Sequence, residues 1–256
     1  MAGEVRSGAM TDLAFDQLAV IEKHSAGVGE LARAHFPDPV PGCPGWNLAD
    51  LVAHLTEVQW FWATIVEERL IEPPDEDQRP PRAAEDQLVA ALGEQTAHLV
   101  GALRGADPQT PVWTWATQQD VAFVARHQVQ EAAVHHWDAG SATGHPVVIE
   151  RPVALDAIDE FLTFSVSTDA DPADPPRPNL GGRFALRCTD GPEAWTLSDG
   201  AAPGAVRVDD EAAAGIPAVE GTASDLLLWL YRRTHLDTSR VPEAVLARFV
   251  ALTYTS

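Results

Sequence analysis

Apolar and polar residues recur at helical spacing through the first 150 residues, and the segment 121–139 shows the most informative pattern. It contains neither proline nor glycine, and steps of three and four residues place one set of side chains on a single stripe. That stripe consists of Val121, Val124, Gln128, Glu131, His135 and Asp138. Such a stripe normally faces other helices, yet its middle is polar. An ionised carboxylate there costs several kcal/mol unless it is paired or holds a metal ion.

Glu131 and His135 are four residues apart, so their Cβ atoms are expected about 5–6 Å apart on one helix face. A carboxylate oxygen and an imidazole nitrogen at this spacing can share one cation, because their bonds to zinc are about 2.0–2.2 Å long. The same spacing also suits a buried hydrogen-bonded pair without a metal. The segment alone leaves both interpretations open.

Three further helices are predicted in the same part of the chain from their apolar faces. They cover residues 11–35, 48–70 and 84–103. Asn47, followed three residues later by Asp50, predicts a capping box at the start of the second of them. Together with 121–139, these helices predict a four-helix bundle that spans residues 11–150.

His54 lies on the apolar side of the second predicted helix, three residues after Leu51 and four before Val58. A single histidine on an apolar face is more often a core residue than a metal ligand. Metal sites in helix bundles are nevertheless built from inward side chains on facing helices. His54, Glu131 and His135 are therefore the set that a bundle would bring together most readily.

Three other histidines are weaker candidates as ligands. His98 belongs to the third predicted helix, and His127 precedes Glu131 by one turn. His136 points about 100° away from His135 around the helix, so we expect His136 to be exposed.

The pattern changes in the C-terminal part of the chain. We expect a helix over 153–167, a linker rich in Asp, Pro and Gly over 168–182, and then short alternating runs typical of strands. The strands are expected at 184–188, 194–197, 205–208 and 216–219. Two helices follow, one capped by Thr222 and one starting at Pro242. The segment 151–256 is therefore predicted to be a smaller α+β domain with a short antiparallel sheet.

The composition excludes several functions. The 256 residues carry a net charge of −21, which repels phosphate backbones and anionic lipids, so we expect neither nucleic acid nor membrane as a partner. No run of about 18 apolar residues is present, and residues 1–10 lack the apolar core of a secretory signal, which favours a disordered leader and a cytoplasmic location. Cys43 and Cys188 are far apart and are expected to be free thiols. The motifs of serine hydrolases, nucleotide-binding loops and zinc proteases are absent.

Three segments together resemble one known family. They are Cys43-Pro-Gly-Trp46 with Asp50-Leu-Val-Ala-His54, then Glu131-Ala-Ala-Val-His135-His-Trp-Asp138-Ala139, and finally Val219-Glu-Gly-Thr-Ala-Ser-Asp-Leu-Leu-Leu-Trp-Leu-Tyr-Arg232. From about Asp12 to its C-terminus the chain is similar to the mycothiol-dependent maleylpyruvate isomerase family. The resemblance implies a DinB-like four-helix bundle followed by an α+β domain, in a protein of actinobacterial type.

The resemblance also implies a site. It implies that His54, Glu131 and His135 bind a divalent metal, usually zinc, and that mycothiol is the thiol cofactor. Three protein ligands leave one position open, as in catalytic rather than structural zinc sites. The family pattern often has histidine where this chain has Gln130. Gln130 lies off the inward stripe, so we expect different substrate contacts rather than a loss of metal binding.

The sequence thus predicts a metal- and mycothiol-dependent isomerase or S-transferase that acts on a small electrophile. We expect Asp138 to hold the second imidazole nitrogen of His135, although a simple charge near the helix end would fit the same position. Arg82, Arg232 and Arg233 are candidates for binding substrate carboxylates. Two alternatives stay open: a thiol-independent hydrolase that uses bound water, and a non-enzymatic zinc-containing binding module.

Overall fold

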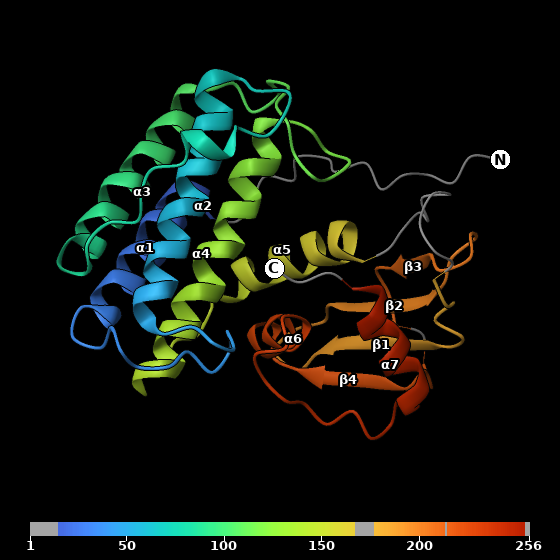
Figure 1. Cartoon of the computed structure of the whole chain (residues 1–256). Helices are drawn as coiled ribbons and strands as arrows, with labels where there is room; N and C mark the ends of the chain where they lie inside the picture. The colour runs from blue at the N-terminus through green and yellow to red at the C-terminus, as the bar shows by residue number, and fades with distance from the viewer. Residues whose placement is uncertain (1–14, 167–176, 213, 254–256) are drawn as a thin grey trace. The chain divides into compact units, whose positions relative to one another are not determined.

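The structure of the chain is a computed structural model, and it describes residues 15–166, 177–212 and 214–253 (Figure 1). The leader expected over residues 1–10 lies outside these ranges. The same holds for the first residues of the helix predicted from Thr11 and for most of the predicted linker.

The compact unit Leu13–Ile149 is a bundle of four helices (Figure 1). Its helices are α1 (Gln17–Ala32), α2 (Leu48–Glu68), α3 (Leu88–Gly105) and α4 (Val121–Thr143). Helix α1 packs against α3 and α4, and α2 packs against the same two helices. Leucine, valine and alanine side chains from the predicted apolar faces fill the space between them. The four predicted helices are therefore confirmed.

Local polar contacts fix the ends of these helices. The Asn47 side chain accepts a hydrogen bond from the Asp50 backbone and the Asp50 carboxylate accepts one from the Asn47 backbone, so the predicted capping box is present. Asp120 caps α4 by accepting a hydrogen bond from the backbone of Phe123. Helix α4 continues past its predicted end to Gly144, whose φ of 70° is left-handed and favours glycine.

The connection between α2 and α3 contains two short 3₁₀ turns, Glu76–Gln78 and Glu85–Gln87. Helix α3 therefore begins at Leu88 and not at the predicted Ala84. In the part of the chain that the structure describes, no helix is both long enough and apolar enough to cross a bilayer.

A histidine pair connects α1 and α4 inside the bundle. The Nδ1 atoms of His24 and His136 are 3.0 Å apart, so one ring donates a hydrogen bond and the other accepts it. His24 is 1% exposed, and His136 is only partly exposed. The expectation that His136 is exposed is therefore wrong. Helix α1 covers the side of α4 from which His136 projects.

The unit that contains Glu150–Ser256 combines a small sheet with helices. Its elements are α5 (Arg151–Glu160), β1 (Arg183–Cys188), β2 (Ala194–Asp199), β3 (Val206–Asp209), β4 (Ala218–Gly221), α6 (Ala223–Leu230) and α7 (Glu243–Leu252). A π-helical turn, Phe161–Ser165, follows α5 directly. Thr222 caps α6 as predicted, by accepting a hydrogen bond from the Asp225 backbone. The predicted α+β class is confirmed.

The strand order is β3-β2-β1-β4 (Figure 1). Strand β1 pairs antiparallel with β2, where Leu186 lies opposite Trp195, and β2 pairs antiparallel with β3. Strand β4 differs from the prediction, because it runs parallel to β1, with Leu186 beside Val219. The sheet is therefore mixed rather than antiparallel. Alternation of side chains has a period of two residues in parallel and in antiparallel strands. The sequence pattern therefore predicts which side chains share a face of the sheet, but it does not predict the direction of pairing.

The buried imidazole of His24 predicts an acid-sensitive bundle. Burial, followed by the charges of His136 and Lys23, lowers the pKa of His24 to about 4. An unfolded histidine takes up its proton near pH 6.5, whereas the folded His24 resists protonation, so stability is lost as the pH falls from 6.5 towards 4. Between pH 7.5 and 4.5 the metal-free wild type should lose about 2–3 kcal/mol more unfolding free energy than a His24→Asn variant.

This difference is measured by urea denaturation of both proteins in the presence of a chelator. The carboxylates titrate alike in both proteins, so their contribution cancels in the comparison. An equal acid-induced loss in wild type and His24→Asn would show that the buried pair does not cause the sensitivity.

Candidate metal centre

Helices α2 and α4 carry the three side chains that the sequence singles out as ligands. Nε2 of His54 lies 3.2 Å from Oε1 of Glu131, and Nε2 of His135 lies 3.2 Å from the same oxygen. The two imidazole rings meet edge to face, with their centroids 5.2 Å apart. The structure thus brings these three side chains together around one carboxylate oxygen.

The cluster is more accessible at one imidazole than elsewhere. The side chains of Glu131 and His135 are 6% and 7% exposed, whereas that of His54 is 29% exposed. The indole of Trp46 packs on the ring of His54, with the ring centroids 4.7 Å apart. Solvent therefore reaches the cluster at His54.

The ionisation states of Glu131 and His135 depend on each other. Burial alone would raise the pKa of Glu131, but the charge of His135 and hydrogen bonds from both imidazoles hold this pKa well below its usual range. Burial alone would lower the pKa of His135, but the charge of Glu131 and hydrogen bonds with Asp138, Cys43 and Glu131 raise it well above its usual value. The surroundings therefore favour an ionised carboxylate beside a positive charge. A divalent cation would meet the same requirement as a proton.

The donor set fits a divalent cation. One ligand atom from each of His54, Glu131 and His135 lies within 4.8 Å of the other two. Tetrahedral zinc with bonds of about 2.0–2.1 Å separates its ligand atoms by about 3.4 Å. The two measured separations of 3.2 Å are close to that value. Two imidazoles and a carboxylate also suit other divalent metals, and the same distances suit a cluster held by hydrogen bonds alone.

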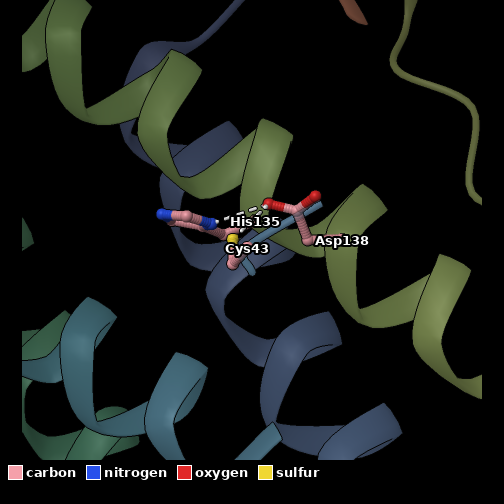
Figure 2. A group of neighbouring side chains, drawn as sticks. All are labelled: Cys43, His135 and Asp138. Atoms are coloured by element: carbon pink, nitrogen blue, oxygen red, sulfur yellow. Dashed lines mark hydrogen bonds and ion pairs between the residues drawn. The ribbon is translucent and has the colours of Figure 1, made fainter. Parts of the chain in front are cut away.

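A second set of side chains contacts His135 from the opposite ring nitrogen (Figure 2). Nδ1 of His135 lies 3.0 Å from Oδ2 of Asp138, which is 0% exposed. The thiol of Cys43 donates a hydrogen bond to the same carboxylate oxygen over 3.5 Å. Asp138 therefore contacts the imidazole that the sequence predicts it to hold. Helical spacing does not predict the contact of Cys43 with the site, because Cys43 lies 95 residues from Asp138.

A tight turn before α2 positions Cys43. The backbone N–H of Trp46 donates to the carbonyl of Cys43 over 3.0 Å, and Gly45 has a φ of 90°. Proline at the second position and glycine at the third are typical of a type II turn, because the third residue needs a positive φ. One turn thus directs Cys43 towards Asp138 and Trp46 towards His54. The turn-forming sequence Cys43-Pro-Gly-Trp46 is the feature from which both contacts could have been predicted.

The arginine candidates have polar partners within their own units. Arg82 forms an ion pair with Asp50 over 2.7 Å, and its side chain is 52% exposed. Arg232 belongs to the C-terminal unit, has a left-handed φ of 62°, and donates to the carbonyl of Val250 over 3.1 Å. Arg233 donates to the carbonyl of Tyr231. Their role in substrate binding stays a prediction.

The weaker histidine candidates have other neighbours. His98 is exposed and pairs with Glu67 over 2.8 Å. Aromatic rings surround His127 on α4, and they belong to Trp62, Trp115 and Phe123. Gln130 is buried, and its amide nitrogen lies 3.3 Å from Nδ1 of His127. The residue that departs from the family pattern therefore contacts His127 in this structure.

The chain thus has the architecture of a two-unit protein. A helical bundle with a clustered glutamate and two histidines is followed by an α+β unit. The family model of the mycothiol maleylpyruvate isomerase N-terminal domain matches residues 18–140, and that of the MDMPI C-terminal domain matches residues 152–248. The chain belongs to the mycothiol-dependent maleylpyruvate isomerase family, which is a family of enzymes.

Two solved structures have a similar fold. One is the crystal structure of the mycothiol-dependent maleylpyruvate isomerase, with 15% identity and a TM-score of 0.58. The other is a histidine-to-alanine mutant of that isomerase, with 14% identity and a TM-score of 0.57. Each similarity covers 89% of this chain and 94% of the other. No curated protein matches the chain.

Proposed function

We propose that this protein is a metal-dependent isomerase or S-transferase that uses mycothiol and acts on a small electrophilic substrate. The observation that carries the proposal is the convergence of His54, Glu131 and His135 from two helices, with 3.2 Å between each imidazole and the carboxylate. Membership of the mycothiol-dependent family supports the choice of thiol. The proposed metal is zinc, which this donor set suits.

The three side chains would hold the metal and leave one position open for a ligand. A divalent cation bound there would supply Lewis-acid chemistry that lowers the pKa of an arriving thiol and favours its thiolate form. Glu131 contributes a negative charge that balances part of the charge of the cation. His54, the more exposed ligand, borders the path by which thiol and electrophile enter.

Residues around the ligands would have distinct tasks. Asp138 accepts the hydrogen bond from Nδ1 of His135 and thereby leaves Nε2 with a free lone pair that can bind the cation. Arg82 and Arg232 are proposed to bind substrate carboxylates, because a guanidinium group matches the geometry of a carboxylate. For Arg82 this requires that its ion pair with Asp50 opens.

A cytoplasmic location is part of the proposal. Both cysteines, Cys43 and Cys188, are free thiols, which are typical of reducing compartments. The proposed partners are therefore an intracellular low-molecular-weight thiol and a small substrate. Nucleic acid and anionic membranes are poor partners for a chain with a net charge of −21.

Zinc should stabilise the protein through the three ligands. At a free zinc concentration of a hundredfold Kd, the free energy of unfolding should rise by about 2.7 kcal/mol. His54→Ala and Glu131→Gln should abolish most of this gain, as measured by thermal unfolding with and without zinc and by metal analysis. His98→Ala is the matched control, because His98 is exposed and pairs with Glu67. Equal stabilisation of the wild type and the ligand variants would place the metal elsewhere.

Asp138→Ala should weaken zinc binding about 10- to 100-fold, because the partner of a metal-bound imidazole fixes the ring and its tautomer. The measurement is a competition titration with a chromogenic chelator. Asp86→Ala, which removes an exposed aspartate from the bundle, should leave the affinity unchanged. An unchanged affinity of Asp138→Ala would mean that Asp138 is only a charge near the end of α4.

Turnover should require the thiol. The zinc-loaded protein is incubated with maleylpyruvate or a general electrophile, with and without mycothiol, and the product is followed by chromatography. Product should form only with mycothiol, and His54→Ala should lower the rate about a hundredfold or more, because several kcal/mol of Lewis-acid stabilisation are lost. Turnover without thiol would favour the hydrolase. A variant that loses only stability would favour the binding module.

A further inference from the structure

The Cys43 thiol is a group that the proposed chemistry does not use, although it lies next to the ligands (Figure 2). Its sulfur donates a hydrogen bond to Oδ2 of Asp138 over 3.5 Å. That same oxygen faces Nδ1 of His135 at 3.0 Å. The thiol also lies within hydrogen-bonding reach of the His135 ring. Thiol, carboxylate and imidazole therefore form one cluster of contacts that joins the segment before α2 to helix α4.

The buried carboxylate of Asp138 depends on such contacts. Asp138 is 0% exposed, so protein groups must replace the hydrogen bonds that water would give to an ionised carboxylate. A donor fixed on its side limits the rotation of the carboxylate away from the imidazole. The Cys43 thiol supplies such a donor, and the tight turn with Gly45 at φ 90° holds the thiol in place.

The position of the thiol also argues against a role for Cys43 as a metal ligand of the proposed centre. Nε2 of His135 faces Glu131, whereas Nδ1 faces the carboxylate to which Cys43 donates. Cys43, His135 and Asp138 do lie close enough to form a metal-binding group of their own. A cation there would need a free lone pair on Nδ1, and that nitrogen donates its proton to Asp138 when Nε2 binds a metal.

We propose that Cys43 is a positioning residue for the metal centre: its thiol holds the Asp138 carboxylate against Nδ1 of His135 and so directs the Nε2 lone pair of His135 towards the cation. This inference rests on the proposed metal site. It assigns the Cys43-Pro-Gly-Trp46 turn a role in the tautomer of an imidazole on another helix.

The first test is made on the metal-free protein by NMR of the Nδ1–H proton of His135, which reports its hydrogen bond to Asp138. Nδ1 carries this proton both in the doubly protonated ring that the raised pKa of His135 favours and in the tautomer that binds a metal. In the wild type the proton should resonate far downfield and exchange slowly with solvent. In Cys43→Val, which removes the donor but keeps a side chain of similar size, it should move upfield and exchange faster. An unchanged shift and exchange rate in a folded Cys43→Val protein would overturn the proposal.

The second test is a double-mutant cycle on zinc affinity. Cys43→Val should weaken zinc binding about tenfold in the wild-type background, the lower end of the range for residues that support metal ligands. In the Asp138→Ala background the same change should alter the affinity less than about twofold, because the group through which Cys43 acts is gone. Cys188→Ala removes the other thiol, in the C-terminal unit, and should change nothing. Additive effects would contradict action through Asp138.

Cobalt substitution separates positioning from ligation. A cobalt-loaded wild type should lack the intense near-ultraviolet charge-transfer absorption of a cobalt–thiolate bond. Its presence in the wild type and loss in Cys43→Val would make Cys43 a ligand and overturn the proposal. A wild type that binds no zinc would remove the proposed metal function, whereas the measurement of the Nδ1–H proton in the metal-free protein would still decide whether Cys43 holds Asp138 against His135.

Discussion

The charge of one buried carboxylate constrains the whole bundle. Glu131 is only 5% exposed, so bulk water stabilises its ionised form poorly and the protein must place positive or hydrogen-donating groups around it. His135 meets this need from the same helix, one turn away, and His54 meets it from a neighbouring helix. The requirement therefore fixes both the rotation of α4 about its axis and the distance between α2 and α4.

Helix caps and apolar packing place the side chains that surround the Glu131 carboxylate. Caps at Asn47 and Asp120 set where α2 and α4 begin, and the start of each helix decides which residues point inward. Leucine, valine and alanine side chains then bring the helices together on the faces that carry the polar cluster. Packing supplies the stability and the polar groups supply the specificity of the arrangement.

The sequence predicted the parts of the structure that depend on local spacing. The four helices, the capping box at Asn47 and the shared face of Glu131 and His135 follow from periods of three to four residues. The contact of Cys43 with Asp138 does not follow from such spacing, because 95 residues separate the two side chains. For the same reason the parallel pairing of β4 with β1 and the partial burial of His136 against α1 were missed, because both depend on which elements become neighbours.

The four-residue turn at Cys43 touches both helices of the cluster, through a sulfur on one side and an indole on the other. It therefore restricts the relative movement of α2 and α4, which are far apart in the chain. The backbone of this turn has little freedom, because the ring of Pro44 fixes its φ and the positive φ at the next position favours Gly45. Any relative sliding of α2 and α4 would therefore strain the turn. Changes in this surface segment, including insertions that leave every proposed ligand intact, would consequently loosen the interior of the bundle.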